Sequence, residues 1–336
     1  MICSYLSNLN FSKSHQLLVN VEEKEQEQES QNVFESSDEN CAAVVGKVCE
    51  NAVPEYDYDK ENEMDPFNVP EFAWDIFQYY YQRENQFKVS DYMHKQSTVT
   101  HQMRSILVDW MVEIQESFEL NHETLYQAVK MTDLFLEKRV VDKRMLQLVG
   151  TAALFISSKF DERCPPACED FLYICDDAYT RDQLLSMERD MLKILQFDLG
   201  FPLSYRFLRR YAKTTKLGME TLTLARFILE SSLMHYEFVS YKESLMASAC
   251  LLLALKMKNE GEWGDVHRKY SGYKTEDLEP ITLRINDLMV NSGSDPKMSQ
   301  LVNIKNKYSH EVFFHVTSVP FLPVQTTTTA PNQHVS

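Results

Sequence analysis

The chain has 336 residues, 44% of them hydrophobic, which is enough for two ordinary domains that each bury a core of their own. Acidic side chains outnumber basic ones by 50 to 34, and residues 1–66 alone contribute −11 of the net charge of −16. No dense Lys/Arg run offers cations to phosphate groups, so a nucleic acid is not expected as a direct partner.

Seven cysteines without a C-x-x-C pair favour ordinary thiols in a reducing compartment over a disulfide framework or a zinc site. No histidine lies near the closest grouping, Cys164, Cys168 and Cys175, so no metal and no cofactor is assigned. The N-terminus lacks a signal-peptide pattern, and the most apolar stretch, Ala247 to Leu255, is too short to span a membrane. These features predict a soluble intracellular protein.

Residues 1–66 are rich in Glu, Gln, Ser and Asn, and we expect them to form a disordered acidic tail. From Pro70 to about residue 315, apolar residues recur at three- and four-residue spacing, which predicts an all-α body. Alternating strand patterns are absent, and glycine-rich phosphate loops have no support among only eight glycines. Residues 317–336 are predicted to be a flexible C-terminal tail.

The spacing predicts helices over residues 70–85, 101–118, 122–138, 143–160, 167–175, 181–195, 203–215, 219–235, 241–258, 263–270 and 275–290. A break follows the sixth of them, where Gly200 is expected to end one helix and Pro202 to begin the next. The break divides the body into two domains, 67–200 and 201–316.

An internal repeat supports this division. Leu148 to Phe160 and Leu245 to Met257 align without gaps at an offset of 97 residues, each with a cluster of small residues, large apolar residues and a lysine near the end. Small side chains let helices approach closely, and apolar residues all round indicate burial on every side. Each segment is therefore predicted to be the central helix of a bundle, in two tandem five-helix domains.

The segment from Thr100 to Ile114 is apolar on more than one helical face. Spacing alone leaves two interpretations open. The helix is buried on both sides, which is the commoner case, or one face lines a groove for an apolar partner peptide.

Several motifs resemble the cyclin family. Met103 to Trp110 (M-R-S-I-L-V-D-W) resembles the cyclin-box signature, and Leu148 to Pro166 resembles the third helix of the box with its following loop. The similarity runs over residues 66–316 and includes Phe171 to Asp177, Met187-Glu188, Phe197-Asp198 and Lys307 to His310. The chain is identified as a member of the mitotic B-type branch, and Gln115 to Tyr126 is most similar to the third B subtype.

This resemblance implies two tandem cyclin boxes preceded by one helix. It also implies a non-catalytic regulatory subunit that binds and allosterically activates a mitotic cyclin-dependent kinase, helps to select its substrates and controls G2/M progression in mitosis or meiosis. The expected location is the nucleus, with the cytoplasm as a further site. The alternative is a cyclin-fold transcription or pocket-type adaptor without a kinase partner. No paired acid/base groups, Ser-His-Asp set or metal spacing favours an enzyme.

The resemblance also implies which residues contact the kinase. Lys159 and Glu188 would hold the loop and helix that carry the kinase's regulatory glutamate. The surrounding apolar contacts would be Phe72, Ile76, Tyr79, Ile156, Phe160, Leu192, Phe197 and Leu199. In the internal repeat Lys159 corresponds to Lys256, but the position of Glu188 becomes Leu283 or Ile285, so the second domain is predicted to lack the Lys–Glu pair.

A second implied site is a substrate-docking patch for basic-leucine motifs of substrates and inhibitors, and the resemblance favours the groove interpretation of its helix. Its members would be Met103, Ile106, Leu107, Trp110, Glu113 and Gln147. Arg104 and Asp133 resemble an internal salt bridge between the first two helices of the box, with a structural role only.

Lys60-Glu61-Asn62 resembles a degradation signal read by the mitotic ubiquitin ligase, and the expected disorder of the tail would make it accessible. The R-x-x-L destruction box of B-type cyclins is missing from the tail. R-x-x-L matches at Arg104, Arg181 and Arg189 lie within predicted helices and are interpreted as coincidences.

Overall fold

The computed structural model describes residues 56–292, 295–296 and 298–323 of the chain. The chain divides into two compact units, residues 1–77 and 78–336. The described part of the first unit holds helix α2 (Tyr58–Glu61), the 3-10 turn η3 (Pro66–Asn68) and the start of helix α3 (Pro70–Arg83), which continues into the second unit.

Short parts of both predicted tails lie within the described residues and have local structure. Residues 56–66 include α2, because the Asp57 carboxylate caps its start by accepting hydrogen bonds from the backbone N of Asp59 (3.1 Å) and Lys60 (3.2 Å). Residues 317–323 are also ordered, because the Asn286 side chain bonds both backbone groups of Leu322, at 2.9 and 3.0 Å. The remaining tail residues, 1–55 and 324–336, lie outside the described part of the chain.

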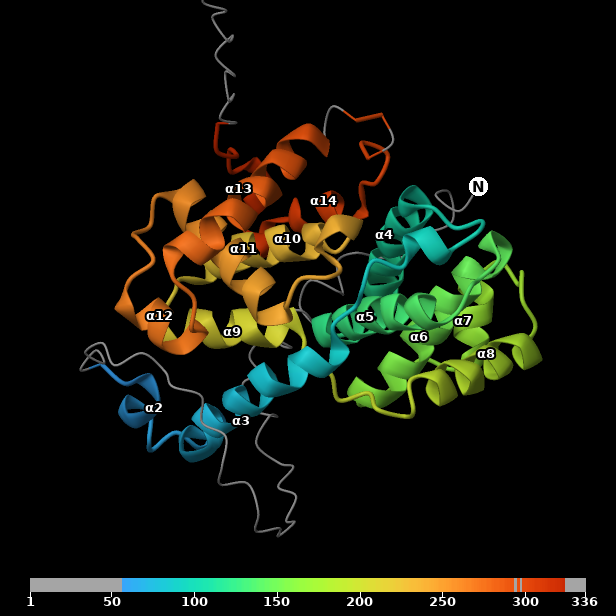
Figure 1. Cartoon of the computed structure of the whole chain (residues 1–336), viewed down its shortest axis with the longest axis horizontal. Helices are drawn as coiled ribbons and strands as arrows, with labels where there is room; N and C mark the ends of the chain where they lie inside the picture. Colours follow the sequence, from blue (N-terminus) through green and yellow to red (C-terminus); the bar gives the residue numbers. More distant parts are fainter. Residues whose placement is uncertain (1–55, 293–294, 297, 324–336) are drawn as a thin grey trace, which may run out of the picture. The chain divides into compact units, whose positions relative to one another are not determined.

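The second unit contains two groups of five helices, which Figure 1 colours from teal to yellow-green and from yellow to orange-red. The first group is α4 (His101–Ser117), α5 (His122–Lys138), α6 (Leu146–Asp161), α7 (Cys168–Ile174) and α8 (Arg181–Ile194). The second group is α9 (Ser204–Thr214), α10 (Met219–Ser232), α11 (Glu243–Lys258), α12 (Asp265–Ser271) and α13 (Thr275–Ser292). The described residues contain no strand, so the all-α prediction with two five-helix repeats is confirmed.

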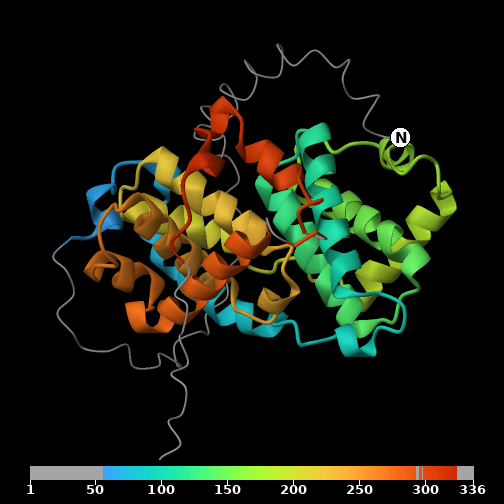
Figure 2. The same ribbon diagram turned by 90° about the horizontal axis from the view of Figure 1, so that it is seen from above.

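Helices α6 and α11 are the central helices of their repeats, as the internal repeat predicted, and the two groups remain distinct in the view from above (Figure 2). Both helices are buried along most of their length, and their bounds differ by 97 residues at each end. Close packing requires a glycine at one point of α6. A Cβ atom at Gly150 would lie 2.7 Å from Cδ1 of Leu107 on α4, too close for any larger residue without displacement.

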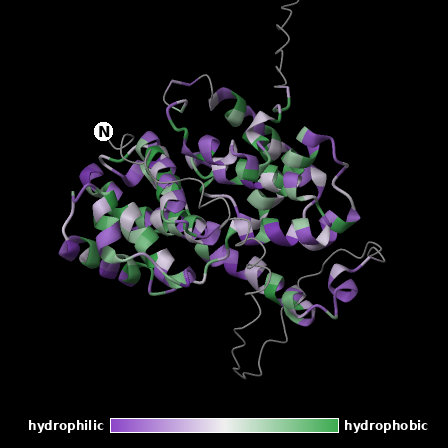
Figure 3. Cartoon of the chain, turned by 180° about the vertical axis from the view of Figure 1, so that it is seen from behind, coloured by the Kyte–Doolittle hydropathy of each residue, from purple (hydrophilic) through white to green (hydrophobic). Residues whose placement is uncertain are grey.

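The surrounding helices carry hydrophobic and hydrophilic residues on the same element, as amphipathic helices that cover a core do (Figure 3). Their starts follow from local capping. Thr100 accepts a hydrogen bond from the Met103 amide (3.3 Å) at the start of α4. The helix predicted from residue 143 starts later, at Leu146, because Asp142 caps a separate 3-10 turn, η6 (Lys143–Met145), by accepting from the Arg144 amide.

A short helix that the sequence did not predict, α14 (Asn303–Tyr308), joins the two repeats. The Lys307 ammonium donates to Glu230 of α10 (2.6 Å) and to Gln115 of α4 (2.7 Å), and Tyr308 donates to Glu230 (2.8 Å). Lys307 and Glu230 are almost completely buried. Burial opposes ionisation of Glu230, but the Lys307 charge and nearby His122 outweigh it and lower the pKa of Glu230 to about 2. Helix α14, called the strap below, is therefore held by a buried ion pair whose two charged groups are both hydrogen-bonded.

Candidate partner-binding surface

The predicted contact pair joins two helices of the first repeat, with Lys159 in the last turn of α6 and Glu188 in the middle of α8. The Lys159 ammonium bonds the Glu188 carboxylate. The ammonium also lies 3.8 Å from the centroid of the Phe155 ring. The two charges therefore neutralise each other in the free chain, and a partner that uses both must insert its own polar groups between them.

Two large aromatic side chains near this pair in the sequence are exposed to solvent. Phe160 follows Lys159 and is 58% exposed, and Phe197, beyond the end of α8, is 66% exposed. Leu192 and Leu199 are half-buried. Ile156 was also predicted as a contact, but only 3% of it is exposed, because it belongs to the core face of α6. We therefore correct its role to support beneath this surface.

Helix α3 carries the other three predicted contacts. Phe72 and Ile76 belong to the first unit and Tyr79 to the second, and all three are exposed, by 56%, 39% and 54%. Three exposed large apolar side chains on one helix are typical of a surface that binds a partner.

The linker after α8 differs from its prediction. Gly200 does not end this helix, which stops at Ile194, six residues earlier. The turn is made by Gln196 and Phe197, which adopt left-handed backbone angles with φ of 57° and 59°. The Phe197 amide donates to the Leu192 carbonyl (2.8 Å), and the Leu199 carbonyl accepts from the Gln127 side chain (3.1 Å). This geometry places Phe197 outside the core.

The predicted docking patch draws on α4 for all its members except Gln147, which belongs to α6. Ile106 is 48% exposed, and Met103, Trp110, Glu113 and Gln147 are half-buried. The opposite side of this helix packs into the core, so α4 is not buried on both sides, and the groove interpretation of its exposed face stays a prediction.

Leu107 is the member of the predicted patch that does not reach the surface. Only 5% of it is exposed, because it packs against Gly150. Sequence reasoning missed a neighbour of the patch, Asn303 of α14, whose side-chain amide lies 3.0 Å from an Asp109 carboxylate oxygen and 3.5 Å from the Glu113 carboxylate. Burial raises the pKa of Asp109 to about 6. In the sequence, the only indication of α14 was the family resemblance at Lys307 to His310, which overlaps the end of this helix.

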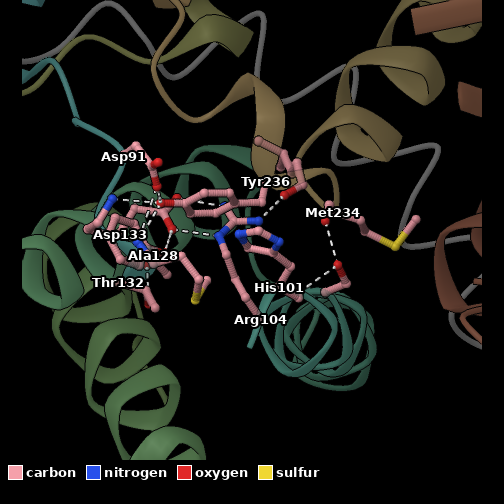
Figure 4. Close-up of polar contacts among 12 residues, drawn as sticks. Asp91, His101, Arg104, Ala128, Thr132, Asp133, Met234 and Tyr236 are labelled. Atoms are coloured by element: carbon pink, nitrogen blue, oxygen red, sulfur yellow. Dashed lines mark hydrogen bonds and ion pairs between the residues drawn. The ribbon is translucent and has the colours of Figure 1, made fainter. Parts of the chain in front are cut away.

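The Arg104–Asp133 pair is present and has more contacts than predicted (Figure 4). The guanidinium bonds both carboxylate oxygens at 2.6 Å, and its third nitrogen donates to the Leu233 carbonyl at 2.8 Å. Beside it, the Tyr236 ring stacks on His101 with centroids 4.5 Å apart. The pair therefore joins α4 to α5, as expected, and also fixes the first repeat to residues 233–236 of the second.

The second repeat contains its own Lys–Glu pair, which contradicts the sequence prediction. Lys256 at the end of α11 bonds Glu279 of α13, as Lys159 of α6 bonds Glu188 of α8. The prediction was wrong because it applied the offset of the central helices to the fifth helices. The segment between α11 and α13 is three residues shorter than the one between α6 and α8, and Glu279 lies about one turn earlier in its helix than Glu188. Glu279 therefore follows Glu188 by 91 residues rather than 97.

The predicted degradation signal lies at the end of α2. Lys60 and Glu61 are exposed, whereas Asn62 is partly buried and its side chain donates to the Tyr58 carbonyl (2.8 Å). The triplet therefore occupies a capped helical turn instead of a disordered segment.

The described residues contain no helix long and apolar enough to cross a membrane. The same residues contain no cluster of three metal-binding side chains. The cysteines among them are free thiols: Cys164, Cys168, Cys175 and Cys250.

Solved structures share this architecture. A viral cyclin from herpesvirus saimiri aligns with a TM-score of 0.57 at 23% identity, covering 63% of this chain and 97% of the viral one. The yeast RNA polymerase II CTD kinase complex CTDK-1 contains a chain that aligns with a TM-score of 0.50 at 13% identity, covering 73% of this chain and 90% of that one. At these identities the likeness establishes the fold alone.

Sequence comparison identifies the family. Residues 75–200 match the cyclin N-terminal domain and residues 202–322 the cyclin C-terminal domain. Proteins described as G2/mitotic-specific cyclin-B3 are 48% identical in Caenorhabditis elegans, 51% in Gallus gallus and 46% in Homo sapiens, over 80%, 77% and 80% of this chain. The matched part spans 71%, 64% and 19% of those proteins. The chain therefore belongs to the cyclin family, with cyclins of the B3 subtype among its relatives.

Proposed function

We propose that the chain is a non-catalytic subunit that binds and activates a mitotic cyclin-dependent serine/threonine kinase and acts at G2/M in mitosis or meiosis. The observation that carries this proposal is the surface of the first repeat, where the Lys159–Glu188 pair accompanies the exposed rings of Phe160 and Phe197. The names of the curated relatives support it.

Activation by binding is a population shift. Converting a kinase that is active in about 1% of molecules into one that is active in about 99% needs about 5.5 kcal/mol of differential binding. The exposed parts of Phe160, Phe197 and Tyr79 offer on the order of 300 Å² of apolar surface, which corresponds to about 7 kcal/mol before association costs. An exposed ion pair supplies about 1 kcal/mol or less. The aromatic side chains would therefore provide most of the binding free energy, and the ion pair would fix the position of the bound kinase.

The test compares the two Lys–Glu pairs. The full chain is mixed with a monomeric mitotic cyclin-dependent kinase, and affinity and histone phosphorylation are measured. The double variant Lys159→Ala, Glu188→Ala should weaken binding by about fivefold, equal to about 1 kcal/mol. The matched variant Lys256→Ala, Glu279→Ala should bind and activate like the parent.

Equal losses in both double variants would contradict the assignment of the first repeat as the binding surface. If the folded parent neither binds nor activates such a kinase, the proposal fails and an adaptor without a kinase partner becomes the leading hypothesis.

We further propose that the exposed face of α4, with Ile106 and Trp110 as apolar anchors and Glu113 as the acidic rim, docks basic-leucine motifs of substrates and inhibitors. Ile106→Ala should raise the KM of a motif-bearing substrate by about tenfold, or about 1.4 kcal/mol, and leave kcat unchanged. Met219→Ala, which removes an exposed apolar side chain in the second repeat, is the control. An equal KM change for a substrate without the motif would contradict docking.

For turnover, we propose that the mitotic ubiquitin ligase reads Lys60-Glu61-Asn62. Because Asn62 is bonded within a helical turn, recognition requires this turn to open. Replacing all three residues by alanine should slow ubiquitination by the purified ligase, whereas replacing the neighbouring Glu63 and Met64 should not. Unchanged ubiquitination of the triple variant would exclude this signal.

A nuclear location, with a cytoplasmic fraction, is proposed from the family resemblance. Imaging of the fluorescently tagged full chain through the cell cycle tests it, and exclusion from the nucleus at every stage would contradict it.

A further inference from the structure

Arg83, in the last turn of α3, lies between two groups of proposed kinase contacts. Its Nε donates to the Gly200 carbonyl (2.9 Å), and a second guanidinium nitrogen bonds the Asp198 carboxylate. On its other side the guanidinium carbon lies 5.8 Å from the centroid of the Tyr79 ring. One side chain thus contacts both Tyr79 and the linker that carries Phe197.

This linker needs external support. Left-handed backbone angles at two consecutive non-glycine residues, Gln196 and Phe197, cost about 1–3 kcal/mol each and persist only where the surroundings enforce them. Phe197 is 66% exposed, so burial of its own ring does not offset this cost. Backbone hydrogen bonds hold one end of the linker, and Arg83 holds the other end through two groups at once.

The arginine is suited to this task because its planar fork can bond a carbonyl and a carboxylate together. It is only partly exposed, with 18% of its side chain accessible, and the Phe87 ring lies 5.0 Å from the guanidinium carbon. A lysine would present one point charge and could satisfy Asp198 but not Gly200 at the same time.

We propose that Arg83 is a positioning residue for kinase binding, which preorganises Phe197 and Tyr79 as one contact surface. This inference rests on the proposed kinase-binding function. Without Arg83 the linker samples other conformations, and the apparent dissociation constant rises in proportion to the lost fraction of the competent one.

A double-mutant cycle with the full chain and the monomeric mitotic kinase tests the mechanism. Arg83→Gln should raise the dissociation constant about tenfold, or about 1.4 kcal/mol, measured by titration calorimetry. In a Phe197→Ala background the same change should have a clearly smaller effect, about threefold or less, because only Tyr79 is left to be positioned. Arg83→Lys should give an intermediate loss.

The matched control is Arg284→Gln. Arg284 also forms a bidentate salt bridge, in which it donates to the two Glu237 carboxylate oxygens at 2.7 and 2.8 Å, but this salt bridge lies in the second repeat. Its loss should leave kinase affinity unchanged. If Arg83→Gln does not fold, Asp198→Asn removes the charged partner on the linker and should weaken binding in the same direction.

Hydrogen exchange of the free chain provides a readout that does not depend on the kinase. The Phe197 and Asp198 amides, which donate to the carbonyls of Leu192 and Leu195, should exchange faster in Arg83→Gln and not in Arg284→Gln. Unchanged exchange, unchanged affinity or an equal loss in the Phe197→Ala background would each overturn the inference. A parent that binds no kinase would instead refute the proposed function, and exchange would still decide whether Arg83 holds the linker.

Discussion

The two repeats of the second unit share a helix plan and a Lys–Glu pair, yet they differ in what surrounds that pair. In the first repeat, Phe160 follows Lys159 in the last turn of α6 and is exposed, and Phe197 is exposed on the linker after α8. In the second, helices α11 and α13, both described in full, carry no large hydrophobic side chain that is strongly exposed.

This contrast separates what the fold requires from what a partner requires. A Lys–Glu pair between the central helix and the fifth helix occurs in both repeats, so the pair alone does not mark a binding surface. The first repeat adds an exposed ring at Phe160 of α6 and another at Phe197 on a strained linker, and such rings are typical of surfaces that a partner covers. The first repeat is therefore the proposed binding side.

The largest expected effect tests whether the repeats form one cooperative unit. Glu230→Ala would leave the buried Lys307 ammonium without its carboxylate and remove the acceptor of Tyr308. We expect the free energy of unfolding to fall by about 3–5 kcal/mol, measured by urea denaturation. Glu237→Ala, at an exposed pair, is the control and should cost less than about 1 kcal/mol. A small loss for Glu230→Ala would show that the strap does not join the repeats energetically.

The next prediction tests whether the cores of the two repeats are equivalent. Leu154 of α6 and Leu251 of α11 occupy matching positions, and both are fully buried. Leu154→Ala and Leu251→Ala should each cost about 2–5 kcal/mol of unfolding free energy. A loss below about 1 kcal/mol in one variant only would mean that the repeats pack their central helices differently.

A smaller effect concerns pH at the junction of the repeats. Burial, with the charges of Arg226 and Lys307, lowers the pKa of His122 from its usual 6.5 to about 3. The unfolded chain then binds more protons than the folded chain between these values, so acidification destabilises the fold. Between pH 7 and pH 5, His122 should account for about 2 kcal/mol of lost stability.

His122→Gln should remove this contribution, so its unfolding free energy should fall less than that of the parent over the same pH range. His310→Gln, at an exposed position, should follow the parent. Parallel curves for all three proteins would contradict the role given to His122.

The smallest expected effect compares the exposed pairs themselves. Glu188→Gln and Glu279→Gln should each change the free energy of unfolding by less than about 1 kcal/mol, because the pairs are partly solvated. Only Glu188→Gln should weaken kinase binding. A large stability loss in either variant would assign that pair a structural role.

The sequence by itself determined the helical body, the number of helices in each repeat and the central position of α6 and α11. These follow from local causes: the spacing of apolar residues, the small residues of the two central helices and caps such as Thr100. The resemblance to the cyclin box also selected Lys159, Glu188, Phe160 and Phe197, which the structure leaves at or near the surface.

Only the tertiary structure decided which residues meet across long separations and which side of a helix is covered. Asn303 reaches Asp109 across 194 residues, and the partner of Lys256 could not be found from a repeat offset that changes between helices. Ile156 and Leu107 belong to matching motifs but are buried, because neighbouring helices cover them. The left-handed turn at Gln196 and Phe197 contains no glycine, so the sequence gives no sign of it. Distant residues such as Arg83 contact this linker, and such contacts are visible only in the tertiary structure.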